Sequence, residues 1–148
     1  MDFLGSAELL SLAIFLGLIV GFEREYIAGK SAGTRTYALV CFGSALFSLI
    51  SRFGFLRESN FQGLDPSRIA AGIVVGIGFL GAGVIILHRD KVMGLTTAAS
   101  IWSVSAIGVA LGVGWIKIAF FGTFLIVFVL GIIGWLEKKF LGKYQKES

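Results

Sequence analysis

The residues of this sequence that could do chemistry lie at the ends of apolar segments. Glu23 and Arg24 follow the first such segment, and Glu25 and Arg35 lie in the same short connection. On a solvated surface, pairs of this kind contribute little. An ionisable side chain at membrane depth is costly and usually marks function. We keep two alternatives: a solvated loop, or a cluster in which Glu23, Arg24 and Arg35 dip among the helices and pair there.

A second set of polar residues precedes later apolar segments. Asp65 and Arg68 open the third segment, and Asp65 with the proline after it suits a helix N-terminus. We interpret this pair as structural, with the mouth of a site as the alternative. Thr96, Thr97 and Ser100 open the fourth segment. Hydroxyl groups of this kind either bond across to a neighbouring helix or line a polar path.

The sequence offers few groups for catalysis or metal binding. Cys41 is the only cysteine, so no disulfide can form within the chain. His88 is the only histidine, and we expect it in a solvated turn. The sequence therefore lacks the Cys and His spacing of a zinc site. Mg²⁺ prefers carboxylate and water oxygens, which makes Glu23 or Asp65 the candidate ligands if the chain binds metal at all. No nucleophile–base pair or Walker motif is present. We expect a protein that is not an enzyme and has no cofactor, with Mg²⁺ left open as a ligand or transported ion.

Residues 72–83 read GIVVGIGFLGAG, inside an uncharged run of 19 residues from Ile69 to Leu87. Glycine in a membrane helix usually lets a neighbouring helix approach closely. The glycines that we assign to helix packing are Gly72, Gly76, Gly78, Gly81 and Gly83. They fall on two sides of the helix, which predicts a central helix with a neighbour on each side, or one neighbour in the protomer and one in an oligomer.

Part of this run, Gly76 to Gly81, matches the dinucleotide pattern G-x-G-x-x-G. The strand–turn–helix context that this motif requires is missing, so packing is the favoured interpretation. The alternative is that the glycines expose carbonyl groups to an ion path, as in broken transporter helices.

Composition and the apolar runs define the elements that position these residues. Hydrophobic residues make up 56% and charged residues 15%, and the mean hydropathy is +0.89. The sequence predicts an all-α polytopic membrane protein with a bundle of about five transmembrane helices. The expected spans are approximately 6–22, 37–53, 69–87, 97–113 and 116–136. Residues 1–136 are thus a transmembrane domain, and 137–148 a basic cytoplasmic tail. From their small faces, we expect the first, third and fourth spans to form the core.

The basic residues set the orientation. Alternating spans place 9 of the 13 Lys and Arg residues on the side that holds the tail, and 4 on the other. The positive-inside rule then puts the N-terminus outside and the C-terminus in the cytoplasm. We interpret the net charge of +4 as a consequence of how the protein is oriented in the lipid bilayer, and not as a sign of nucleic-acid binding.

Several of these segments together resemble the MgtC/SapB family of bacterial inner-membrane proteins. The resemblance rests on residues 21–51, 65–86 and 94–114, and so covers nearly the whole chain. The family pattern falls on Gly21, Glu23, Arg24, Gly33, Arg35, Thr36, Asp65, Arg68, Gly76, Gly78, Phe79, Gly81, Gly83, Gly94, Leu95, Thr96, Thr97, Ala98 and Trp102. The longer members carry a cytoplasmic C-terminal domain, and this chain resembles the short, SapB-like form without it.

The resemblance implies a multi-pass protein of the bacterial inner membrane, linked to magnesium limitation and, in pathogens, to intracellular survival. Many members are labelled magnesium transport proteins, but a regulatory role is implied at least as strongly, since MgtC itself is linked to restraint of the rotary ATP synthase. We expect a regulator that binds other membrane proteins through its small-residue faces. The alternative is an oligomeric channel or transporter for Mg²⁺ or another cation; a homo-oligomer is left open.

Overall fold

The computed structural model describes residues 3–30, 32–54, 65, 67–88 and 91–140, without the side chain of Lys138. In chain order its elements are α1 (Phe3–Phe22), η1 (Glu23–Ile27), α2 (Thr34–Leu49), η2 (Ile50–Gly54), α3 (Ser67–Val84), β1 (Ile86–His88), β2 (Lys91–Met93), α4 (Leu95–Gly112), α5 (Ile116–Phe128), η3 (Val129–Ile133) and α6 (Gly134–Phe140). The η elements are π-helical turns that continue the helix before them. The predicted tail begins inside α6, and residues 141–148 lie outside the described residues.

Five helical stretches are long and apolar enough to cross a membrane, which confirms the five predicted spans. They are Phe3–Ile27, Thr34–Phe53, Ser67–Val84, Leu95–Gly112 and Ile116–Glu137. A helix satisfies every backbone hydrogen bond within itself, which is what the lipid interior requires. The chain is therefore a multi-pass, essentially all-helical protein.

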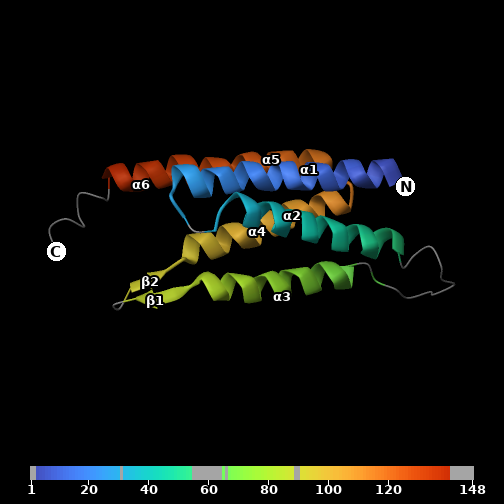
Figure 1. Cartoon of the computed structure of the whole chain (residues 1–148), viewed down its shortest axis with the longest axis horizontal. Coiled ribbons are helices and arrows are strands. Elements are labelled where there is room, and N and C mark those ends of the chain that lie inside the picture. The colour runs from blue at the N-terminus through green and yellow to red at the C-terminus, as the bar shows by residue number, and fades with distance from the viewer. Residues whose placement is uncertain (1–2, 31, 55–64, 66, 89–90, 141–148) are drawn as a thin grey trace.

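The helices run back and forth along one long axis, so that the start of α1 and the end of α6 lie at opposite ends of the molecule (Figure 1). α1 and α5 lie side by side, α2 and α4 form the middle, and α3 lies on the outside (Figure 1). The connections after α1 and α3 are at one end, and the connection after α4 is at the other, where α2 also ends; α5 continues directly into η3 and α6. Consequently η1 and the beginnings of α2 and α4 share one end of the bundle.

The core is formed by α1, α2 and α4, so the expectation that α3 would be central is wrong. A Cβ added at Gly17 of α1 would lie 2.7 Å from Ala38 Cα, and one added at Gly108 of α4 would lie 2.8 Å from Ser44 Cβ. α2 therefore lies in close contact with a helix on each side. Its own small residues, among them Cys41 and Ala45, are fully buried. The prediction was wrong because it compared the small faces of the first, third and fourth spans and overlooked the stripe of Ser, Cys and Ala residues on α2.

The third span ends earlier than expected, and a small hairpin follows it. α3 stops at Val84 instead of Leu87, and residues 86–88 pair antiparallel with 91–93. Gly94 begins α4 with a φ of +90°, a left-handed conformation that glycine adopts without strain. His88, expected in a solvated turn, is exposed and ends β1.

Candidate functional site

Glu23 and Arg24 are buried at the end of the first membrane-spanning segment. Each is 4% exposed, and both belong to the π-helical turn η1. Such turns occur often at functional sites. Of the two alternatives from the sequence, the one in which these side chains dip into the bundle matches the observed geometry. Arg35 is exposed and does not join them.

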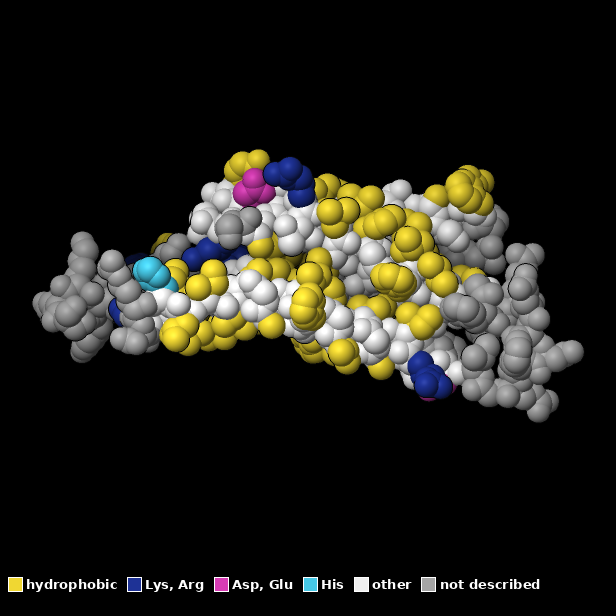
Figure 2. All heavy atoms as spheres, turned by 60° about the horizontal axis from the view of Figure 1, so that its bottom comes forward, with side chains coloured by type: hydrophobic (Ala, Val, Ile, Leu, Met, Phe, Trp, Pro, Cys, Tyr) yellow, Lys and Arg dark blue, Asp and Glu magenta, His cyan; other side chains and the backbone are white. Residues whose placement is uncertain are grey.

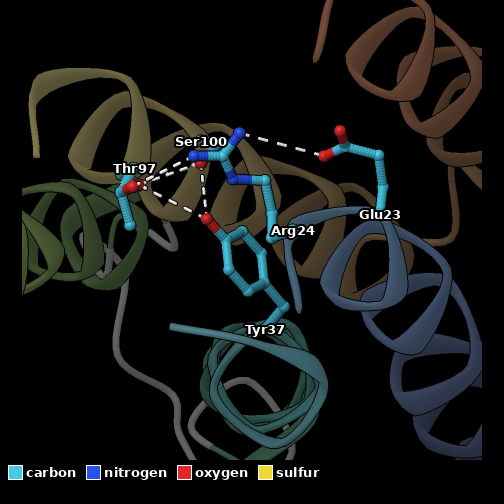
Figure 3. Close-up of polar contacts among 5 residues, drawn as sticks. All are labelled: Glu23, Arg24, Tyr37, Thr97 and Ser100. Atoms are coloured by element: carbon cyan, nitrogen blue, oxygen red, sulfur yellow. Dashed lines mark hydrogen bonds and ion pairs between the residues drawn. The ribbon is translucent and has the colours of Figure 1, made fainter. Parts of the chain in front are cut away.

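Arg24 reaches across the bundle to the first turn of α4. Its Nη2 donates a hydrogen bond of 3.1 Å to Thr97 Oγ1, and Thr97 is itself buried. Figure 3 shows the guanidinium group extending from η1 toward α4, with Glu23 on its other side. This contact joins the end of α1 to the beginning of α4.

Tyr37 of α2 completes the cluster. Its hydroxyl lies 2.5 Å from Ser100 Oγ, and Ser100 Oγ donates to the Thr97 carbonyl at 2.9 Å. Because that bond uses the Ser100 hydrogen, the Tyr37 hydroxyl is the donor to Ser100. Its other contact, to the Thr97 carbonyl, is longer at 3.5 Å. Three helices thus contribute to one buried polar cluster, defined as Glu23, Arg24, Tyr37, Thr97 and Ser100.

The two charged residues of this polar cluster are not fully satisfied. Glu23 Oε2 lies 3.9 Å from Arg24 Nη1, close enough for charge attraction but too far for a hydrogen bond. Glu23 Oε2 and Arg24 Nε are buried and have no hydrogen-bond partner within the described part of the chain. Buried polar groups are normally paired, so an unpaired acceptor and an unpaired donor on two consecutive buried residues single out this site.

Other polar residues predicted from the sequence lie elsewhere. Glu25 is exposed and accepts hydrogen bonds from Thr34 N at 2.8 Å and Thr34 Oγ1 at 2.5 Å, so it caps α2. Thr96 is exposed at the start of α4. Of the predicted polar residues at this end, the structure thus gathers Glu23, Arg24, Thr97 and Ser100.

Asp65 and Arg68 lie at the opposite end of the bundle, where α3 begins. Asp65 Oδ1 accepts a hydrogen bond of 2.9 Å from Ser67 N, as expected of an N-cap residue. Hydrogen bonds from the Ser67 hydroxyl and N–H, and the nearby charge of Arg68, hold the pKa of Asp65 below its ordinary value. Asp65 therefore cannot act together with Glu23 within one chain.

Tyr37 is the member that sequence reasoning missed. The signal was the alternation of spans, which places the beginnings of the second and fourth spans at the end where the first span finishes. A tyrosine at such a position carries a hydroxyl that seeks a partner when it is buried.

The glycines assigned to helix packing have few neighbours in the single chain. A Cβ at Gly81 would lie 3.6 Å from Ala98 Cβ, whereas a Cβ at Gly72, Gly76, Gly78 or Gly83 would meet none of the atoms that the structure describes within 4 Å. Packing of these four against another molecule stays a prediction.

The polar cluster is a poor fit for a dehydrated divalent cation. It offers one carboxylate, and the guanidinium group 3.9 Å from that carboxylate would repel the ion. Among the residues that the structure describes, no three His, Cys, Asp or Glu side chains converge. Mg²⁺ demands near-octahedral oxygen coordination. The geometry fits a compensated ion pair better than a metal site.

Comparison with known proteins gives consistent matches. The model of the MgtC family matches residues 10–139. The chain is 42% identical over 138 residues to the Escherichia coli protein named "Putative magnesium transporter YhiD", covering 92% of this chain and 63% of that one. It is 41% identical to MgtC of Brucella abortus, over 86% of this chain and 51% of that one. It is 33% identical to SapB of Bacillus subtilis, over 88% and 57%.

The chain thus spans between half and two thirds of the length of these relatives. No solved structure matches it.

Proposed function

Since the chain belongs to the MgtC family, we propose that it regulates other membrane proteins in magnesium homeostasis, from the bacterial inner membrane. The observation that carries the proposal is the buried Glu23–Arg24 pair, which Arg24 ties to Thr97 of α4. A guanidinium group beside the carboxylate of the cluster repels a passing cation, whereas the hydrogen bond from Arg24 to Thr97 holds η1 against α4. The polar cluster then serves to fix α1, α2 and α4 as one body.

A regulator also needs a surface that it offers to other proteins. The exposed side of α3 supports this requirement, because four of its glycines have no neighbour among the described residues of the chain. In membranes, such small residues allow close helix contact. The related protein YhiD is named as a putative magnesium transporter. We therefore propose magnesium homeostasis as the physiological process in which this chain acts.

The second candidate is a cation channel or transporter, formed by several copies of the chain. It is favoured by two buried atoms of the first spanning segment, Glu23 Oε2 and Arg24 Nε, for which the described residues provide no hydrogen-bond partner. Unpaired polar groups at such a position are typical of ion and proton pathways. In an oligomer, several Glu23 carboxylates would offer the charge that one chain lacks.

A flux measurement paired with a growth assay separates the two candidates. Purified protein in liposomes is tested for Mg²⁺ uptake under a gradient, alongside Glu23→Gln and, as a matched exposed carboxylate, Glu25→Gln. A regulator gives no protein-dependent flux, yet restores growth of a deletion strain at low Mg²⁺. Flux in the wild type that Glu23→Gln abolishes and Glu25→Gln retains would overturn the regulatory proposal.

The proposed orientation, with the N-terminus outside, is tested with single cysteines in a Cys41→Ala background. Ser67→Cys should react with a membrane-impermeant maleimide in intact cells, and Lys91→Cys only after lysis. The reverse pattern would invert the orientation.

A further inference from the structure

An apolar groove runs between α2 and α3 on the outside of the bundle. Its volume is about 640 Å³, within the range of small-molecule sites. The α3 wall is one helical stripe from Ile69 to Leu80, and the facing α2 wall runs from Phe47 back to Leu39. Buried Ile77 and Ser44 lie among its lining residues. Figure 2 looks onto this side, where hydrophobic side chains lie along α3 with white backbone visible between them, and a basic group lies at its right-hand end.

The glycines of α3 make this groove wide. Gly72 and Gly76 line it, and a Cβ added at either would meet no atom within 4 Å. Glycine inside a helix costs about 1 kcal/mol relative to alanine unless close approach rewards it. Because none of the residues that the structure describes approaches Gly72 or Gly76, the space in front of them is available to an occupant from outside.

The length of the groove indicates what that occupant is. From Ile69 to Leu80 the helix rises about 17 Å at 1.5 Å per residue. The hydrocarbon core of a bilayer is about 30 Å thick, so one leaflet accounts for about 15 Å. The groove therefore matches the acyl region of a single leaflet, whereas a transmembrane helix would need a surface along both leaflets.

The end of the groove carries charge at head-group level. Arg68 precedes Ile69 and is exposed, and Asp65 lies close by, with Arg68 N donating to its carbonyl at 3.2 Å. A phosphate group complements the guanidinium of Arg68. An ammonium group on the same lipid complements the carboxylate of Asp65. This pair of opposite charges fits a zwitterionic head group better than an anionic one.

We propose that the α2–α3 groove is a binding site for one zwitterionic phospholipid, whose acyl chain lies against Gly72 and Gly76 and whose head group lies at Arg68 and Asp65. The proposal does not depend on the polar cluster. It shares Gly72 and Gly76 with the α3 surface that the proposed regulatory function offers to other proteins, and phospholipid retained by the purified chain tests the groove apart from that function.

The test measures phospholipid retained after purification in mild detergent, by native mass spectrometry and lipid extraction. Gly76→Leu fills the groove and should lower the retained phospholipid by about tenfold. Gly83→Leu is the matched control, since Gly83 lies on the same helix, has equal free space and does not line the groove. It should retain the wild-type amount. Thermal unfolding of each variant checks that the fold is intact.

Arg68→Gln tests the head group, and should lower retention by about threefold, in line with an exposed charge pair. In nanodiscs of mixed composition, the wild type should enrich phosphatidylethanolamine over phosphatidylglycerol. Enrichment of phosphatidylglycerol instead would overturn the assignment of the head group.

Equal retention in Gly76→Leu and Gly83→Leu would overturn the site as a whole. So would a wild type that proves to be a dimer together with a Gly76→Leu variant that is a monomer and keeps its phospholipid, because the groove would then receive a second copy of the chain.

Discussion

Arg24 and Thr97 are 73 residues apart in sequence, yet Arg24 Nη2 donates a hydrogen bond of 3.1 Å to Thr97 Oγ1 inside the bundle. This bond joins the end of the first spanning segment to the beginning of the fourth. It also anchors a guanidinium group whose partner charge, Glu23, is equally buried. The stability of the fold and the chemistry of the candidate site are therefore coupled at the same residues.

The first prediction concerns the buried ion pair. Glu23→Gln leaves the Arg24 charge without compensation, and we expect it to lower the free energy of unfolding by about 3 kcal/mol. Glu23→Gln combined with Arg24→Met removes both charges and should be more stable than Glu23→Gln alone. Unfolding in mixed SDS–detergent micelles measures each variant. A double variant as unstable as the sum of the two single changes would show that the charges do not interact.

The second prediction concerns the hydroxyl groups of the polar cluster. Tyr37→Phe and Ser100→Ala each break the 2.5 Å contact between α2 and α4, and should lower the free energy of unfolding by about 1 kcal/mol. Ser103→Ala is the matched control, because Ser103 Oγ donates only to Ala99 O of its own helix. It should unfold like the wild type. Equal effects of Ser100→Ala and Ser103→Ala would contradict a role for the interhelical bond.

The third prediction separates tight glycines from open ones. An added Cβ at Gly17 would lie 2.7 Å from both Ala38 Cα and Tyr37 O, which are backbone atoms that cannot turn aside. Gly17→Ala should therefore destabilise the protein by about 1–3 kcal/mol. Gly78→Ala places its methyl group in open space and should be neutral or stabilising by up to about 1 kcal/mol. Thermal unfolding of the two variants side by side decides the matter, and the reverse order would contradict the packing of α1 on α2.

The fourth prediction concerns pH at the start of α3. The pKa of Asp65 is lower in the folded protein than its ordinary value. Its contribution to stability is thus present above the ordinary carboxyl pKa of about 3.9, and is lost as the pH falls through the lowered value. Hydrogen exchange at the first turn of α3 should accelerate on acidification beyond the intrinsic dependence. Asp65→Asn keeps a capping oxygen but cannot titrate, so its hydrogen exchange should show no such acceleration at low pH. An equal acceleration in this variant would mean that another group titrates.

Much of the architecture follows from the sequence, and the reason is local. Each spanning helix satisfies its own backbone groups, so an apolar run of sufficient length defines a span without reference to the others. Local sequence also predicted N-capping by Asp65, which the hydrogen bond from Ser67 N confirms. It did not predict the hairpin after Val84, where the apolar run continues but the helix does not.

The sequence by itself determined the five spans, the family and the residues from which a site could be built. Only the tertiary structure decided that α2 and not α3 is central, that Tyr37 joins the polar cluster, and that Glu23 and Arg24 are buried while Arg35 is exposed. Contacts between helices depend on how side chains far apart in the sequence fit together within a few ångströms. In lipid, that fit cannot be read from hydrophobicity, because the surroundings of the bundle are as apolar as its interior.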